Sequence, residues 1–239
     1  MNYPARRFRR PQPEHCSRFW RARSSAGPCN RTAPSSMPSE TNSTDSSPPG
    51  HERTTMTTSP SPAPSPVTGA VFIATSVDGY IARTDGGIDW LLSRDENLGE
   101  TGYDAFIATT DAIVMGRNTY EVGCSFDTWP YEGMRVFVVS TTLEPGADDR
   151  ISVHRGLDEL FEAAHDEGVR HVYADGGRLI TSFLQRGLIT EITITTAPVI
   201  IGSGLPLFGA IDHDIPLDHV RTTTLGNGMT QSVYRVSAG

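Results

Sequence analysis

The amino-acid sequence predicts an α/β domain with a mostly parallel central sheet and an antiparallel hairpin at the C-terminal end. Continuous apolar runs at residues 70–75, 111–115, 135–139 and 170–174 are typical of strands buried on both faces, as in parallel sheets. Helical patterns alternate with these runs, which favours a sheet covered by helices. Gly226-Asn227-Gly228 lies between two runs of strand-forming residues, at 219–225 and 229–236, and this pattern indicates a hairpin.

The first strand, residues 70–75, follows a Pro/Ser-rich linker and leads into two glycine-containing loops. Loops of this kind beside a central strand are often functional. A helix is expected over residues 97–109, because Tyr103, Phe106 and Ile107 recur on one side of it. The strand at 111–115 then runs directly into Gly116 and a short helix.

The strand at 135–139 ends in three hydroxyl residues, and a short strand follows at 151–154. Apolar residues at helical spacing predict a helix over 157–165. The strand at 170–174 ends at Asp175-Gly176-Gly177, where another helix opens and continues to Gly187. A strand rich in Ile and Thr is expected over 189–199.

Three strand ends carry residues suited to an anionic ligand. These are Gly116 with Arg117, Ser140 with Thr141, and the glycine pair after Asp175. Glycines allow close backbone approach, and the free N–H groups at a helix start favour an anion such as a pyrophosphate. A tight turn without a ligand is the alternative for the glycine pair alone. Ligands of α/β sheets bind at the carboxyl ends of strands, so the convergence of three such ends favours binding.

Composition divides the chain into a disordered extension, residues 1–66, and one domain, residues 67–239. The extension holds nine of the twenty arginines, four acids and twelve of the seventeen prolines. The remaining 173 residues hold eleven arginines and twenty-four acids, and they suffice for one full core.

Several classes of function are excluded or disfavoured by residue content. The chain contains no lysine, so a Walker A lysine and a Schiff-base lysine are excluded. The acidic domain disfavours nucleic acid, and no apolar stretch reaches the length of a membrane span. The three cysteines lack CxxC spacing, which suggests reduced thiols in a cytoplasmic protein. Asp212-His213-Asp214 lacks the spacing of a metal site, and we expect no metal.

The motifs together resemble the dihydrofolate reductase superfamily, and more closely the reductase domain of bacterial riboflavin biosynthesis and its stand-alone relatives. The resemblance spans residues 69–237 and implies a three-layer, dihydrofolate-reductase-like fold that uses NADPH. The chain lacks the H-x-E and P-C-x-x-C motifs of a zinc deaminase, so we expect it to catalyse the reduction alone. The resemblance rests on Val77-Asp78-Gly79-Tyr80-Ile81, Trp90, Met115-Gly116-Arg117-Asn118-Thr119, Val139-Ser140-Thr141, Gly176-Gly177-Arg178 and residues 197–204.

The resemblance also implies where NADPH would lie. The 2′-phosphate is expected near Arg117, Ser140 and Thr141, beside Gly116. The pyrophosphate would be held by Asn118, Thr119, Gly176, Gly177 and Arg178. The nicotinamide would lie near Ala74, Ile81 and Ala82.

Three residues are candidates for the substrate side. Folate reductases have a third glycine at the position of Asp175, whereas riboflavin-type reductases tend to have an acid, which could bind a ribityl or ribose hydroxyl. Trp90 is an expected substrate contact, with a core position as its alternative. Asp95, five residues later, is the candidate catalytic acid by analogy with the folate enzymes, and a solvated loop or helix-cap acid is the alternative.

Two functions from different classes therefore stay open. One is an NADPH-dependent reductase that transfers a hydride to a small heterocyclic, ribitylamino-pyrimidine or pterin-type substrate. The other is a non-catalytic protein that binds NADPH or a flavin on the same scaffold. The resemblance also implies a homodimer, with no nucleic-acid or membrane partner.

Overall fold

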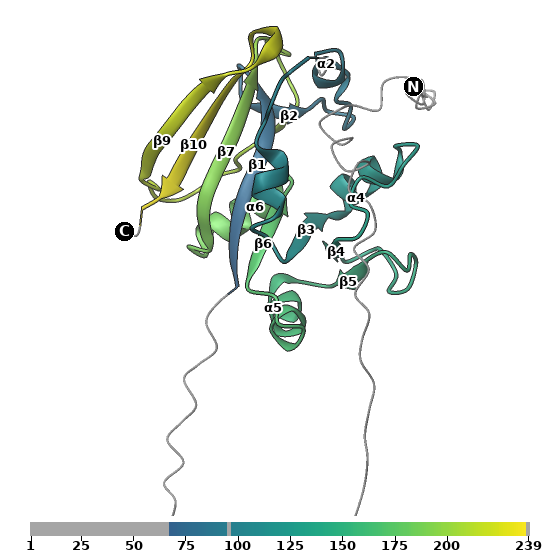
Figure 1. Cartoon of the computed structure of the whole chain (residues 1–239). Coiled ribbons are helices and arrows are strands. Elements are labelled where there is room, and N and C mark those ends of the chain that lie inside the picture. The colour runs from purple at the N-terminus through teal and green to yellow at the C-terminus, as the bar shows by residue number, and fades with distance from the viewer. Residues whose placement is uncertain (1–66, 95–96, 238–239) are drawn as a thin grey trace, which may run out of the picture.

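An eight-stranded sheet forms the centre of the structure, a computed structural model that describes residues 67–94 and 97–237 (Figure 1). The strand order is β5-β4-β3-β6-β1-β7-β10-β9, and β10 alone runs antiparallel to its neighbours β7 and β9. The strands are β1 (Thr68–Ser76), β3 (Ala112–Gly116), β4 (Arg135–Val139), β5 (Ser152–His154), β6 (His171–Asp175), β7 (Ile189–Ala197), β9 (Leu217–Thr224) and β10 (Thr230–Val236).

Helices cover both faces of the sheet, because alternate residues of its strands point to opposite sides. On one face, α5 (Leu157–Asp166) and α6 (Gly177–Gln185) pack over Val71 and Ile73 of β1. On the other face, α3 (Tyr103–Ile107) and α4 (Arg117–Cys124) pack over Phe72 of the same strand. The predicted three layers with a mostly parallel sheet and a C-terminal hairpin are therefore confirmed.

The hydrophobic periodicity of α6 shows why this helix forms where it does. Leu179, Ile180, Phe183 and Leu184 are all buried, and Phe183 is fully enclosed. Burial of one such side chain contributes about 1.5–3 kcal/mol. Gly187, at φ 65°, lies just beyond the end of the helix, in a backbone conformation that glycine adopts without strain.

Two element boundaries and one small sheet differ from the predictions. The helix expected over 97–109 is confined to α3, because Asn97, Gly99 and Gly102 have positive φ angles that cannot continue a right-handed helix. The strand expected over 189–199 ends at Ala197, before Pro198. A small second sheet was not predicted, and it pairs β2 (Tyr80–Ala82) with β8 (Leu205–Pro206).

Two short elements complete the part of the chain that the structure describes. They are the helix α2 (Asp89–Leu92), which precedes the undescribed residues 95–96, and the 3-10 turn η2 (Gly226–Gly228) in the hairpin. The predicted disordered extension, residues 1–66, lies outside the described residues.

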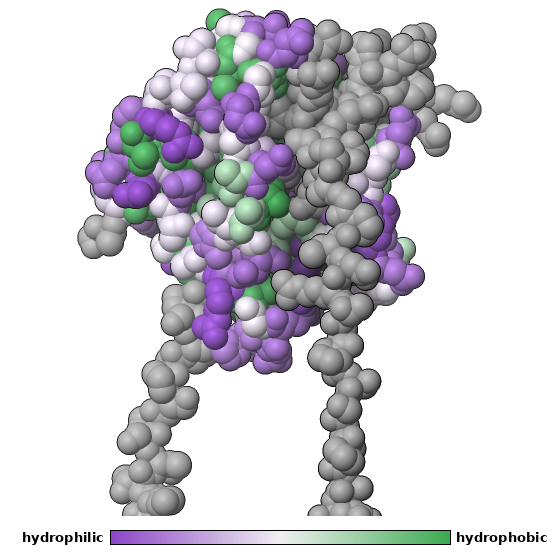
Figure 2. All heavy atoms as spheres, in the orientation of Figure 1, coloured by the Kyte–Doolittle hydropathy of each residue, from purple (hydrophilic) through white to green (hydrophobic). Residues whose placement is uncertain are grey.

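The visible surface is mostly hydrophilic, with small separate hydrophobic areas, one of them over the edge strands β9 and β10 (Figure 2). Every residue of β9 is exposed, including Leu217 and Val220. The homodimer expected from the resemblance stays a prediction.

Candidate active site

The carboxyl ends of the central strands meet at one edge of the sheet. In the β3–β6 ladder Met115 is paired with Asp175, and in the β3–β4 ladder Gly116 is paired with Val139. The three turns singled out in the sequence, which follow β3, β4 and β6, therefore lie side by side. Both α4 and α6 begin at this edge, on opposite faces of the sheet (Figure 1).

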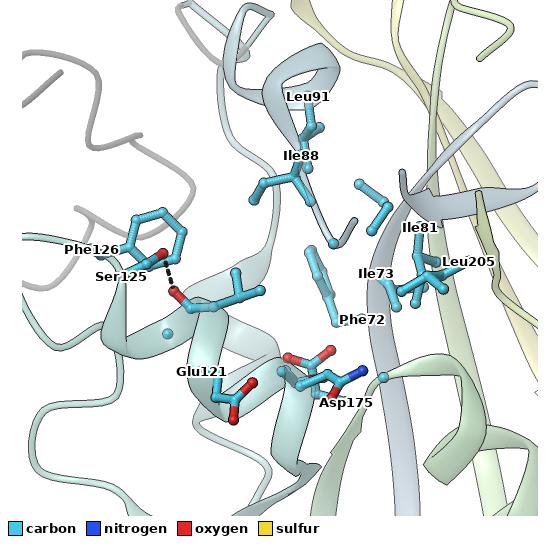
Figure 3. A pocket seen from close by; sticks show the side chains of 18 of the residues that line it. Phe72, Ile73, Ile81, Ile88, Leu91, Glu121, Ser125, Phe126, Asp175 and Leu205 are labelled. Carbon is cyan, nitrogen blue, oxygen red and sulfur yellow. Dashed lines mark hydrogen bonds between the residues drawn. The ribbon is translucent and has the colours of Figure 1, made fainter. Parts of the chain in front are cut away.

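A pocket of about 570 Å³ opens at the same edge (Figure 3). One side of α4 faces it, since Asn118, Glu121 and Val122 follow helical spacing, and Ser125 lies just after the helix. Most other walls are apolar or aromatic, a composition typical of sites for small organic ligands. They include Phe72, Ile73, Ala74, Ile81, Ala82, Ile88, Leu91, Tyr103, Phe126, Tyr131, Tyr173 and Leu205.

Asp175, the last residue of β6, is a buried carboxyl in the wall of this pocket. Its side chain accepts a hydrogen bond at Oδ2 from the Tyr131 hydroxyl, at 3.3 Å. Burial disfavours the charged form and raises the pKa of Asp175 to about 6, although hydrogen bonds from Tyr131, the Gly176 N–H and Tyr173 act in the opposite direction. Among the described acids with a resolved shift, Asp175 is the one whose pKa is raised.

The surroundings of Asp175 allow its carboxyl group to hold a proton near neutral pH. Tyr131 and Tyr173 are themselves buried, and burial, with the nearby Asp175 charge, raises the pKa of each phenol well above its usual range. The Tyr173 hydroxyl donates to the carbonyl oxygen of Phe72 at 2.8 Å. Strongly shifted groups that line a cleft are candidates for proton transfer.

The glycine pair after Asp175 serves two different steric needs. Gly176 has φ 99°, and a Cβ there would lie 2.7 Å from the Thr119 hydroxyl, so the turn requires glycine. A Cβ on Gly177 would collide with the carbonyl oxygens of Pro206 and Leu207, in and just after β8. Gly177 is therefore required by the contact between α6 and β8, and it does not line the pocket.

The helices α4 and α6 both present uncapped N-termini. Neither has a side-chain cap, and neither carries an acid in its first turn. By contrast, α5 has Asp158 and Glu159 in its first turn. Unpaired N–H groups and the helix dipole favour an anion at such an end, so α4 and α6 can receive phosphate oxygens.

Arg117 lies beside the turn that follows β4. Its Nη1 donates to the Thr142 hydroxyl at 2.7 Å, and its Nε forms an ion pair with Glu121 at 3.1 Å. The buried Ser140 hydroxyl accepts hydrogen bonds from the N–H groups of Thr142 and Leu143 and thereby shapes the turn. Arg155 reaches the same turn and donates to the Ser140 carbonyl at 3.1 Å.

The residues predicted from the sequence fall into three groups. Ala74, Ile81, Ala82, Asn118, Thr119, Asp175 and Gly176 line the pocket. Gly116, Arg117, Ser140, Thr141, Gly177 and Arg178 lie on the same edge of the sheet but outside the pocket wall. Asp95 lies outside the described residues.

The structure corrects the expectation that Trp90 contacts the substrate. Its side chain is 3% exposed and packs with Leu98, Leu225 and Met229, away from the pocket lining. The indole Nε1 is buried with no hydrogen-bond partner among the described residues. The neighbouring residues Ile88 and Leu91 face the pocket instead, because the short helix α2 turns Trp90 inward. The core position is the one the structure shows.

Three candidate site residues were not identified in the sequence. Tyr173 stands two positions before Asp175, so the strand period already places both on one face. Glu121 follows Asn118 at helical spacing on α4. Tyr131 reaches Asp175 from a loop, and no local pattern identifies it.

Two further observations concern the described part of the chain. In residues 67–94 and 97–237, no group of three or more His, Cys, Asp or Glu side chains is arranged to hold a metal ion. None of the helices within these ranges combines the length and apolarity needed to cross a membrane.

Comparison with known proteins places this chain in a family. The family model of the RibD C-terminal domain matches residues 68–231. The uncharacterized protein YwjB of Bacillus subtilis is 32% identical over 162 residues, which cover 66% of this chain and 92% of that protein.

Solved structures agree with this match. A putative riboflavin biosynthesis protein from Shewanella sp. PV-4 has 36% sequence identity and a TM-score of 0.66, and the match covers 72% of this chain and all of that one. A diaminohydroxyphosphoribosylaminopyrimidine deaminase/5-amino-6-(5-phosphoribosylamino)uracil reductase from Thermotoga maritima, 13% identical, shares the fold with a TM-score of 0.54, over 72% of this chain and 57% of that one. The predicted dihydrofolate-reductase-like fold is thus confirmed, and the chain belongs to the RibD C-terminal domain family.

Proposed function

We propose that this chain is an NADPH-dependent reductase of a small heterocyclic substrate of the aminopyrimidine or pterin type. The observation that carries the proposal is Asp175, a buried carboxyl with a pKa of about 6 in the wall of a largely apolar pocket. The pocket adjoins two uncapped helix N-termini and two arginines, Arg117 and Arg178. Family membership supports the same reading.

The residues at the edge fit the chemistry of NADPH. The open space beside Gly116 and the uncapped start of α4 suit phosphate oxygens. Arg117 and the hydroxyls of Thr141 and Thr142 would hold the 2′-phosphate, and Gly176, Thr119 and Arg178 would hold the pyrophosphate. Ala74, Ile81 and Ala82 would bound the nicotinamide, since all three line the apolar part of the pocket.

When bound, the reduced nicotinamide supplies a hydride to an electron-poor carbon of the substrate. Asp175 holds the proton that must accompany it, on a carboxyl oxygen whose pKa of about 6 leaves a protonated fraction near neutral pH. It gives this proton to the substrate heteroatom next to the reduced carbon and then regains one from solvent. Phe72, Ile73 and Leu205 exclude water from the reacting groups.

The test is a titration of the full chain with NADPH and, separately, with NADH, followed by tryptophan fluorescence. We expect NADPH to bind in the range of about 1–100 μM and NADH to bind at least about tenfold more weakly. Oxidation of NADPH that depends on an added aminopyrimidine or pterin would establish reduction. NADPH binding without such oxidation by any ring tested would favour the non-catalytic binding protein. Absence of binding of either cofactor would contradict the reductase and leave only a flavin-binding protein.

A further inference from the structure

We propose that Arg150, which lies outside the pocket wall, is a positioning residue for the acid inside the pocket. Held by an ion pair with Asp148, it fixes Trp129. Trp129 in turn keeps the Tyr131 hydroxyl on the Asp175 carboxyl. The inference rests on the proposed function for its effect on turnover, but its structural content can be tested without any substrate.

Tyr131 belongs to a segment whose position is set largely by side-chain packing. Residues 125–134 join α4 to β4 and are described throughout, and they form no helix or strand. A Cβ on Gly123, near the end of α4, would lie 3.3 Å from the Trp129 ring and 3.4 Å from the Tyr131 ring. Both rings therefore pack against the helix where it has no side chain. Their centroids are 5.2 Å apart in an edge-to-face arrangement, so the place of Trp129 determines the place of Tyr131.

The Arg150 guanidinium lies over the Trp129 ring, with Cζ 4.4 Å from the ring centroid. It also forms a two-point ion pair with Asp148, in which Nε lies 2.9 Å from Oδ1 and Nη2 lies 2.6 Å from Oδ2. The Asp148 side chain is only 12% exposed, and its Oδ2 accepts a further hydrogen bond from the Tyr120 hydroxyl of α4 at 2.9 Å. A planar guanidinium bound at two points has a fixed orientation, so the ion pair holds the cation against the ring.

Both members of this ion pair stay charged where Asp175 titrates. The hydrogen bonds from Arg150 hold the pKa of Asp148 well below its usual range, although burial acts in the opposite direction. The bonds to Asp148 likewise raise the pKa of Arg150. Because the pKa of Asp175 is about 6, its titration is not mixed with that of the ion pair.

Two effects can link the ion pair to Asp175, and they differ in sign. Burial raises the pKa of Asp175, and the hydrogen bond from Tyr131 acts against it. If the pair acts by positioning, loss of either member loosens this bond and raises the pKa. If the pair acts by its electric field, loss of the cation raises the pKa and loss of the anion lowers it. The other titratable side chains of the pocket wall are unchanged in both cases, and these are Asp85, Tyr103, Glu121 and Tyr173.

The experiment follows the carboxyl carbon of Asp175 by NMR in the full chain with isotope-labelled aspartate, without cofactor. Its signal is the one that Asp175→Asn lacks, and it is titrated from about pH 4 to about pH 8. We expect both Arg150→Met and Asp148→Asn to raise the pKa of Asp175 by about 0.5–1 pH unit. Shifts of opposite sign would indicate a field effect and overturn the inference, as would a pKa that is unchanged or lowered in both variants.

A double variant tests whether the effect passes through the Tyr131 hydroxyl. Tyr131→Phe removes this hydroxyl, so the addition of Arg150→Met should move the pKa of Asp175 by less than about 0.2 pH unit further. A full further rise in the double variant would show that Arg150 acts by another route, and would overturn the inference.

Arg186→Met is the matched control. Arg186 also pairs with an aspartate, Asp158, at 2.6 Å, and also lies over an aromatic ring, that of Phe161, at 5.8 Å. These contacts lie at α5 and the end of α6, on the opposite face of the sheet from Trp129 and Tyr131. We expect Arg186→Met to leave the pKa of Asp175 unchanged, whereas a rise equal to that in Arg150→Met would attribute both to general loosening of the fold and contradict positioning.

The NMR titration separates this inference from the proposed function, because it needs neither NADPH nor a substrate. A rise in both variants supports the inference even if no ring compound is reduced, and in that case the reductase proposal alone fails. Conversely, NADPH oxidation by the unmodified chain together with an unmoved pKa of Asp175 in Arg150→Met and Asp148→Asn contradicts the inference alone.

Discussion

The two ends of the site hold charge in opposite ways. The basic end consists of Arg117, Arg155 and Arg178 with the hydroxyl residues 140–142, and its arginine side chains are largely exposed. The acidic end is the pocket with Asp85, Glu121 and Asp175, where Asp175 is only 9% exposed. This edge of the sheet thus places an exposed cluster of arginines next to a buried carboxyl group.

The difference in burial predicts a difference in energetic weight. An exposed charge is screened by water and salt, so removal of an arginine from the basic end should change affinity by less than removal of the buried carboxyl changes turnover. A buried carboxyl is poorly solvated, and its protonation responds strongly to its few neighbours. Substitutions should therefore have their largest effects at the acidic end and progressively smaller effects across the basic end.

The largest effect is expected for Asp175→Asn. Removal of the proton-donating carboxyl should lower kcat by about 10²–10⁴-fold, the range typical of general acid–base groups, and leave the Kd for NADPH within about threefold. Steady-state kinetics with cofactor binding measured separately checks both parts. Asp85→Asn is the matched control, because Asp85 is exposed at the same pocket and should change kcat by less than about threefold. A similar loss in both variants would contradict a special role for the buried acid.

The pH dependence sharpens the same test. Because the protonated form of Asp175 is the competent one, kcat should be highest below pH 6 and fall as the pH rises through the raised pKa of about 6. Tyr131→Phe removes a hydrogen bond that lowers this pKa, so the fall should move to higher pH. A profile that Tyr131→Phe leaves in place would assign the ionisation to another group.

The acidic end was harder to predict from sequence than the basic end. Gly116, Arg117, Ser140 and the glycine pair are local motifs at strand ends, and their common edge follows from a parallel sheet. The partnership of Asp175 with Tyr131 joins residues 44 positions apart through a loop, and only the folded chain shows it. Likewise the burial of Trp90 depends on the distant hairpin residues Leu225 and Met229.

The strands and most helices were accessible because their patterns are local. Continuous apolar runs placed β1, β3, β4 and β6 to within a few residues, and apolar residues at helical spacing did the same for α5 and α6. The helix expected over 97–109 was too long because the positive φ angles of Gly99 and Gly102 are a backbone property, which the apolar spacing did not reveal.

A smaller effect is expected for Arg117→Ala, at the basic end. Loss of its charge-assisted bonds to a 2′-phosphate should weaken NADPH binding by about 10–100-fold and NADH binding by less than about threefold. Paired fluorescence titrations measure this. Glu121→Gln is the control, because it removes the partner of Arg117 and keeps the guanidinium, so NADPH affinity should hold or increase. Equal losses for both cofactors in Arg117→Ala would remove Arg117 from the 2′-phosphate.

The smallest effect is expected for Arg178→Ala. Arg178 is exposed in the first turn of α6, where its charge adds to that of the helix N-terminus, and a solvated charge at such a position changes affinity by about 2–5-fold. NADPH and NADH share the pyrophosphate, so both should weaken equally, and the loss should diminish at high salt. Arg170→Ala removes the same charge just before β6, at the opposite end of that strand, and should leave both affinities unchanged. A selective loss of NADPH in Arg178→Ala would instead place the 2′-phosphate at α6 and reverse the proposed orientation of the cofactor along the basic end.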